Sequence, residues 1–233
     1  MSTAFWNGHG CFGDSFCLCA AAHIFAKKTN TTVQVSYWEP FKNLANYFDG
    51  IEYVPENQCE KVDTGAELEF VKHNGVTRFY EWMLRHSKIE SQYNEVNIEM
   101  NIKPFDCRPF ISLAVYGNKN GPMSKDVMAK MLIRAKAFYP NHQFRIIGHF
   151  QSDVELYANL MKDYQIKDER TTDRTCDVVM NQIRSSSLVL GVHTGLLYPS
   201  LGLGIPVWCE RSKNPNHDFC LDFPSNRPFF FEP

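Results

Sequence analysis

Short apolar runs alternate with longer amphipathic stretches along most of the chain. In the first half, positions from Asp14 to Lys28 repeat at helical intervals and predict a long helix. Shorter helices are expected at Phe41–Tyr47 and Thr77–His86. The apolar runs that predict strands here are Thr3–Trp6, Thr32–Tyr37 and Ile51–Val54.

The second half repeats a strand-loop-helix unit more clearly. Strands are expected at Pro109–Val115, Phe144–Ile147, Ser187–Gly191 and Pro206–Cys209. Helices are expected at Ser124–Tyr139, Asp153–Asp163, Cys176–Arg184 and His193–Leu203. This alternation predicts an α/β fold with a parallel sheet covered on both faces. Such sheets bind ligands at the carboxyl ends of their strands.

Composition narrows the class of protein. The 233 residues are 44% apolar and 21% charged, which predicts a packed core, and the net charge is −2. A protein that grips nucleic acid over its whole surface is usually basic. One basic helix face, at Lys125, Lys130 and Arg134 or at Arg78 and Arg85, would still allow local contact with nucleic acid.

The eight cysteines include no Cys-x-x-Cys pair and no Cys pair near a His at zinc spacing. This pattern predicts a reduced, cytoplasmic protein without a structural metal. The apolar stretch 16–26 is too short to span a bilayer and lacks a basic leader.

A glycine-rich turn, Gly8–Gly13, matches G-x-G-x-x-G between an expected strand and an expected helix. Glu39 is a tolerable candidate for the acidic residue of a dinucleotide site, so an NAD-dependent oxidoreductase is one alternative. Asp14 weighs against it, because a carboxylate at the helix start would repel a pyrophosphate. Asp14 is either a helix cap or a general base held at the mouth of the sheet.

Three loops of the second half are expected to converge above the strand ends. The loop at Gly117–Gly121 can approach a ligand through its backbone, and its Lys119 can neutralise phosphate charge. Gly148 and His149 follow a strand directly. The third loop, Gly191–Leu196, carries His193 and a Thr194 hydroxyl that suit an anion site.

The Gly13-Asp14 pair and the run from Ser187 to Val207 resemble the ADP-heptose:lipopolysaccharide heptosyltransferases. The resemblance implies a GT-B-like fold, with two Rossmann-like domains whose parallel sheets face a cleft. Residues 1–105 would form the acceptor-side domain and residues 106–233 the nucleotide-sugar-binding domain. The family usually has Asp at the position of His193 and His at the position of Tyr198, and its chains are longer.

The resemblance also implies roles for individual residues. Asp14 would be the base on the acceptor hydroxyl. The residues expected at the donor are Gly13, Asn118, Lys119, Ser124, Gly148, His149, His193, Thr194, Gly195 and Tyr198. No Asp-x-Asp motif is present to hold a metal, and cationic and amide donors can stabilise the leaving diphosphate.

The sequence therefore predicts a glycosyltransferase that takes a sugar from a nucleotide-sugar co-substrate, inverts the anomeric carbon and needs no metal or other cofactor. A transferase acting on hydroxymethylated DNA bases, as in some phages, and a non-catalytic nucleotide-binding module are further alternatives. The sugar, the nucleotide base, the acceptor and the oligomeric state stay open. So does the role of the aromatic tail at 226–233, which would pack back across the other domain or against a partner.

Overall fold

The computed structural model describes residues 2–6, 11–63, 99–117, 121–148, 154–172, 176–211 and 228–232. The chain falls into two compact units. Unit 1 comprises Met1–Ile102 with Thr175–Asp177, and unit 2 comprises Lys103–Arg174 with Val178–Pro233. The expected helix at Thr77–His86, and with it Arg78 and Arg85, lies outside the described residues.

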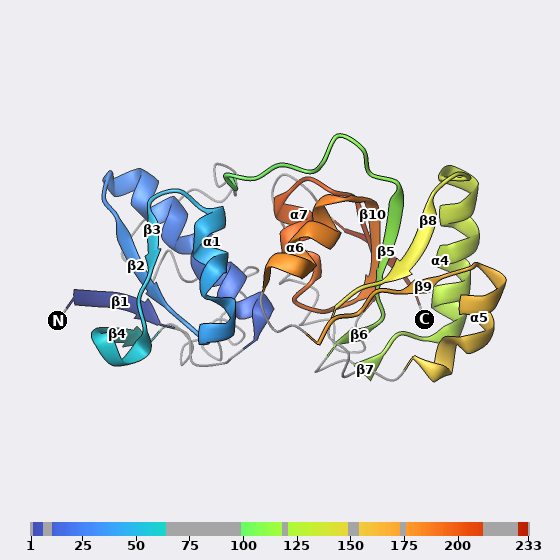
Figure 1. The fold of residues 1–233 in the computed structure, drawn as a ribbon, viewed down its shortest axis with the longest axis horizontal. Helices are drawn as coiled ribbons and strands as arrows, with labels where there is room; N and C mark the ends of the chain where they lie inside the picture. Colours follow the sequence, from blue (N-terminus) through green and yellow to red (C-terminus); the bar gives the residue numbers. More distant parts are fainter. Residues whose placement is uncertain are drawn as a thin grey trace. The chain divides into compact units, whose positions relative to one another are not determined.

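Unit 1 is built on a parallel sheet whose strands lie in the order β3-β2-β1-β4 (Figure 1). The strands are β1 (Ser2–Trp6), β2 (Val33–Ser36), β3 (Ile51–Tyr53) and β4 (Cys59–Asp63). Two 3₁₀ helices, η1 (Glu39–Tyr47) and η2 (Glu56–Gln58), follow β2 and β3.

Helix α1 (Phe12–Thr29) packs against this sheet, and most of its side chains are buried. Aromatic rings fix it from two sides, because Phe25 meets Phe5 of β1 at 5.6 Å and Phe16 meets Phe48 at 5.4 Å between ring centroids. Asn30 ends the helix in the left-handed conformation, φ 53°, and its N–H bonds to the carbonyl of Ala26.

Unit 2 contains a parallel sheet in the order β12-β11-β10-β5-β8-β9. Its strands are β5 (Phe110–Ala114), β8 (Gln143–Ile146), β9 (Lys167–Asp168), β10 (Ser186–Val192), β11 (Val207–Glu210) and β12 (Phe229–Phe231). Counted along the chain from β5, this is the 3-2-1-4-5-6 order of Rossmann folds. A two-stranded hairpin, β6 (Tyr116–Gly117) and β7 (Gly121–Pro122), follows β5.

Helices cover both faces of the unit 2 sheet (Figure 1). They are α4 (Lys125–Phe138), η4 (Glu155–Tyr157), α5 (Ala158–Asp163), α6 (Cys176–Arg184) and α7 (Leu197–Gly202). Ile111 and Leu113 of β5 belong to the core cluster with α4 and Tyr157. Ser112, between them, faces α6 through the Arg145 network described next.

A buried polar network stands under the α6 face of this sheet. Arg145, 4% exposed, donates to the Ser112 hydroxyl at 2.9 Å, to the main-chain oxygen of Gln182 at 2.5 Å and to the Ser185 hydroxyl at 2.7 Å. It also pairs with Glu169 at 3.1 Å. The Nε, Nη1 and Nη2 atoms of Arg145 each have a hydrogen-bond acceptor. The buried positive charge is therefore compensated, and it links β5, β8 and α6.

The aromatic tail packs on the chain itself. Strand β12 pairs in parallel with β11 and forms one edge of the unit 2 sheet. Phe229 and Phe231 lie on Trp208, with ring centroids 6.5 and 5.6 Å away, and the Arg134 guanidinium covers both rings at 4.8 and 5.9 Å. Residues Phe229–Phe231 thus pack within unit 2, a place that neither alternative of the sequence analysis named.

Most expected elements are present with shifted ends. The stretch Phe41–Tyr47 is helical as expected and belongs to a 3₁₀ helix, η1. Helix α7 begins at Leu197, not at His193, because the residues before it form a turn. Strands β4, β9 and β12 were not predicted; β9 is only two residues long and β4 carries the alternating charges of Cys59–Asp63. Within the described ranges, no helix has the length and apolar character needed to cross a bilayer.

Candidate functional site

The strand order places one crevice in unit 2 where ligands are expected. Strands β5 and β10 are neighbours, and the chain leaves them toward opposite sides of the sheet. In open parallel sheets, the carboxyl ends of such a strand pair form the ligand crevice. The hairpin loop after β5 and the turn at His193 after β10 both begin at this point.

The described parts of the three predicted loops lie together at this crevice. A Cβ atom added to Gly117 would lie 2.4 Å from the main-chain oxygen of His193, so only glycine allows these two loops to touch. Gly148 has φ +107°, and a Cβ there would lie 2.8 Å from a methyl group of Leu196. The predicted convergence is confirmed for these contacts. Asn118, Lys119 and His149 lie outside the described residues.

The turn after β10 presents the groups that suit an anion. His193, Thr194 and Gly195 are partly exposed, whereas Leu197 and Tyr198 are buried. The His193 Nε2 atom lies 3.3 Å from the Tyr198 hydroxyl, so the two residues in which the chain departs from the heptosyltransferase pattern contact each other. Helix α7 has six residues, which leaves the Thr194 hydroxyl and the turn amides as the main anion donors.

Ser124 lies at the N-cap position of α4, as expected, but its side chain caps nothing. Its main-chain N–H donates instead to the Glu210 carboxylate, at 3.0 Å. Glu210 ends β11, is 9% exposed and pairs in register with Val192, which precedes His193. A carboxylate of the protein itself therefore occupies the positive end of α4.

The loop that carries Ser124 is also fixed from below. The Tyr157 hydroxyl donates to the main-chain oxygen of Met123 at 2.7 Å. Burial, and next the nearby Glu210 carboxylate, raise the pKa of Tyr157 far above its ordinary value, so this donor keeps its proton. Glu210 was not predicted as a site residue from the sequence. The pattern that could have indicated it is a single carboxylate directly after the apolar run Pro206–Cys209.

Unit 1 places Asp14 at the corresponding end of its own sheet. Helix α1 starts two residues earlier than expected, so Asp14 is its third residue, and Gly13 is buried. The Cys11 thiol at the N-cap donates to the Asp14 carboxylate, and the Ser15 hydroxyl bonds to the main-chain oxygen of Cys11 at 3.0 Å. Asp14 stays partly exposed. This geometry suits a helix-capping carboxylate and equally a carboxylate held for a substrate hydroxyl.

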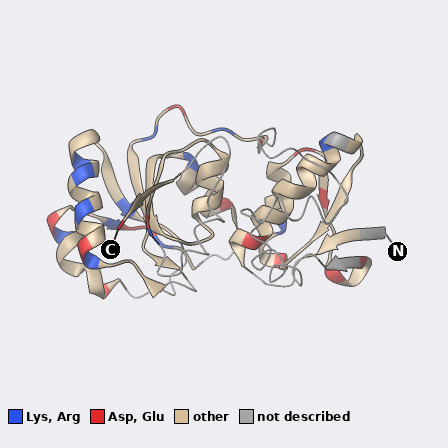
Figure 2. Cartoon of the chain, turned by 180° about the vertical axis from the view of Figure 1, so that it is seen from behind, with Lys and Arg blue, Asp and Glu red and all other residues tan. Residues whose placement is uncertain are grey.

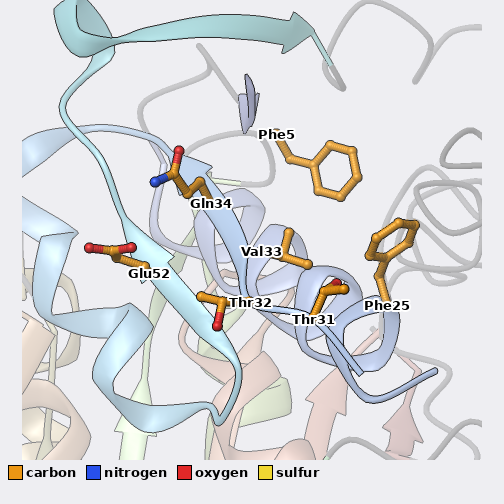
Figure 3. Close-up of a pocket in the computed structure, with 7 residues that line it drawn as sticks. All are labelled: Phe5, Phe25, Thr31, Thr32, Val33, Gln34 and Glu52. Atoms are coloured by element: carbon orange, nitrogen blue, oxygen red, sulfur yellow. The ribbon is translucent and has the colours of Figure 1, made fainter. Parts of the chain in front are cut away.

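A pocket of about 440 Å³ lies elsewhere in unit 1, beside the start of β2 (Figure 3). Its lining residues are Phe5, Phe25, Thr31, Thr32, Val33, Gln34 and Glu52. Thr31 and Phe25 come from the loop and helix end that precede β2, so the pocket lies at the amino-terminal side of that strand. None of the residues expected at the donor or acceptor lines it, and the carboxyl-end residues remain the better candidates.

The expected basic helix face is present on α4 (Figure 2). Lys125, Lys130 and Arg134 are all exposed there. Arg134, however, lies over aromatic rings of α4, β11 and β12, which gives this side chain a packing role. No phosphate-binding arrangement follows from this face.

No protein-family model and no curated protein sequence matches the chain. Solved structures do match it. The heptosyltransferase WaaC of E. coli with ADP aligns over 98% of this chain and 93% of its own, with a TM-score of 0.70 and 9% identity. A family 9 glycosyl transferase from Veillonella parvula aligns over 99% and 87%, with a TM-score of 0.67 and 9% identity.

The dodecameric, iron-containing glycosyltransferase TibC from enterotoxigenic E. coli aligns over 97% of this chain at a TM-score of 0.65 and 12% identity. The chain spans only 61% of the length of TibC. These alignments extend over both units. The fold is GT-B-like, with two Rossmann-like parallel sheets, as the resemblance implied.

Proposed function

We propose that the chain is a glycosyltransferase that moves a sugar from a nucleoside-diphosphate sugar to an acceptor hydroxyl. The observation that carries the proposal is the contact between Gly117 and His193, which joins two loops at the crevice of a Rossmann-type sheet. Support comes from the GT-B-like fold, because structures sharing it include WaaC with ADP and TibC with ADP-D-beta-D-heptose.

Unit 2 would hold the donor. The Thr194 hydroxyl and the amides of the following turn would bind the diphosphate, and His193 would add a donor whose Nε2 contacts Tyr198. Gly148 lets the loop after β8 pack closely on Leu196, because a Cβ there would lie 2.8 Å from a methyl group of Leu196. Asn118, Lys119 and His149 stay proposed donor residues on the strength of the sequence.

Unit 1 would hold the acceptor, with Asp14 as the base. As the acceptor oxygen bonds to the anomeric carbon, its proton passes to the Asp14 carboxylate. The bond from that carbon to the diphosphate oxygen breaks, and the leaving nucleoside diphosphate takes the electron pair. A base acting on the face opposite the leaving group inverts the anomeric carbon. Amide and imidazole donors would stabilise the leaving group without a metal.

The test is a thermal-shift panel of ADP, GDP, UDP, CMP and NAD, each with and without EDTA. A ligand that binds only the folded protein raises the melting temperature by mass action. One nucleoside diphosphate should raise it in both conditions, and a sugar derivative of that nucleotide should raise it further. If only NAD raises the melting temperature, the result would favour an NAD-dependent oxidoreductase instead. The absence of any nucleotide shift would contradict the proposal.

Thr194→Val supplies the matched variant, because valine keeps the side-chain shape and removes the hydroxyl. The nucleotide shift should shrink in Thr194→Val while the melting temperature without ligand changes little. NMR of the product formed from an α-linked donor would then report inversion directly as a β-linkage.

A further inference from the structure

Three aromatic rings form a row at the carboxyl-terminal side of the unit 1 sheet. Phe12 is the first residue of α1, and its ring meets that of Phe41 edge-to-face at 5.4 Å. Phe41 meets Trp38 in the same manner at 5.0 Å. Phe41 is 4% exposed, whereas Trp38 is 38% exposed. The row thus runs from the start of α1 to an accessible indole that rests on a buried ring.

The row and Asp14 share one edge of one sheet. Phe12 and Asp14 both lie in the first turn of α1, which follows β1, and Trp38 follows β2 by two residues. Strands β1 and β2 are parallel neighbours that end in register at Trp6 and Ser36. An exposed indole and the proposed base are therefore presented at the same strand ends.

The charges described around this row are mainly acidic. Glu39 adjoins Trp38 in the chain, and the Lys42 ammonium lies 3.9 Å from its carboxylate. Glu39 and Glu56, after burial, raise the pKa of Tyr53, so both carboxylates act on this region. Such a field repels phosphate groups and suits a ligand without charge.

We propose that this aromatic row, Phe12, Phe41 and Trp38, binds an uncharged carbohydrate acceptor by stacking a sugar ring on Trp38. The weakly positive C–H face of a sugar ring complements the negative face of an indole. Its hydroxyls remain at the rim, where one can reach Asp14. The inference rests on the proposed glycosyl transfer for its purpose, but the binding itself needs no donor.

The experiment is saturation-transfer NMR with the whole chain and neutral probes, the methyl β-glycosides of glucose, galactose, mannose and N-acetylglucosamine. At least one probe should receive saturation at its ring protons. Trp38→Ala should weaken its binding roughly tenfold, the worth of one stacked ring, and Trp38→Phe should recover part of that loss. Phe138→Ala removes an even more exposed ring, 64% against 38%, from unit 2 and should leave probe binding unchanged.

Two readouts separate this inference from the general function. The nucleotide thermal shift of Trp38→Ala should equal that of the unchanged chain, while its melting temperature without ligand should fall by a few degrees because the ring contact with Phe41 is lost. Saturation in no probe, or equal saturation in Trp38→Ala, would overturn the sugar-stacking role even if nucleotides bind. A single-stranded oligonucleotide that binds through Trp38 would overturn it as well, in favour of a nucleic-acid acceptor. If no nucleotide raises the melting temperature but a glycoside still binds, only the donor assignment would be overturned.

Discussion

The α-carbon of Gly117 faces the main-chain oxygen of His193 so closely that a methyl group on it would lie 2.4 Å from that oxygen. The obstacle is backbone and cannot rotate away. Two loops separated by most of unit 2 in sequence are consequently held in one arrangement, and that arrangement is the candidate donor site.

Gly117→Ala should separate these loops. We expect a loss of roughly 1–3 kcal/mol in the free energy of unfolding, since the His193 turn has to move, together with a much smaller nucleotide thermal shift. Urea unfolding and the nucleotide panel measure the two effects. Gly204→Ala is the matched control: Gly204 has φ +70° but nothing within 4 Å of an added Cβ, so nucleotide binding should persist. Equal loss of binding in both variants would refute the loop-contact argument.

Asp14→Asn should retain the fold and the nucleotide shift, because the amide fits the same space in the first turn of α1. The rate of sugar transfer should fall by about 10²–10⁴, the usual worth of a general base. Asp126→Asn changes a comparable first-turn acid, in α4, and should leave the rate unchanged. Full transfer activity in Asp14→Asn, with normal donor affinity, would remove the base assignment.

Glu210→Ala should destabilise unit 2 by about 1–2 kcal/mol, because the Ser124 N–H loses its acceptor and α4 loses a negative charge at its positive end. Glu210→Gln keeps an acceptor and should cost less. Both variants should bind a nucleoside diphosphate more tightly, as titration calorimetry would show, since a carboxylate no longer stands near the phosphates. Weaker binding in Glu210→Gln would mean that the carboxylate contacts the ligand favourably.

Tyr37 makes unfolding sensitive to alkaline pH. Its hydroxyl donates to the main-chain oxygen of Lys42 at 3.2 Å and accepts the Ala45 N–H at 3.0 Å. Burial raises the pKa of Tyr37 far above its ordinary value near 10. The folded phenol therefore stays protonated where the unfolded one ionises, so its contribution is complete below about pH 10 and declines above it.

Tyr37→Phe should lower the free energy of unfolding by about 1–3 kcal/mol at pH 7, because the Ala45 N–H is left without its acceptor. The free energy of unfolding of this variant should also fall less steeply between about pH 9 and 11 than that of the unchanged chain. Urea midpoints across that range test this. Tyr116→Phe removes a phenol hydroxyl from a residue that is 41% exposed and serves as the control. If the urea midpoint of Tyr37→Phe falls with pH as steeply as that of the unchanged chain, another group causes the alkaline sensitivity.

The apolar runs were sufficient to predict β5, β8, β10 and β11 of unit 2 but not the edge strands β9 and β12, because a strand buried on both faces has an almost continuous apolar sequence. Ser187–Gly191 is such a run, and the strand there, β10, extends it by one residue at each end. The glycines that bring the loops together were also visible. What no local pattern reveals is a partner distant in sequence: Glu210 on Ser124, the Cys11 thiol on Asp14, or the ring contacts that join Phe12 to Trp38 through Phe41.

Strand β12 is synthesised after the other strands of the unit 2 sheet, so it can add to that sheet only last. The rings of Phe229 and Phe231 cover Trp208 and lie under Arg134, so the β11 edge and one end of α4 keep exposed apolar surface until these residues are added. During synthesis, β5, β8 and β10 leave the ribosome well before them. The nascent sheet consequently carries an uncovered, aggregation-prone edge, and its closing strand arrives after the rest of the sheet.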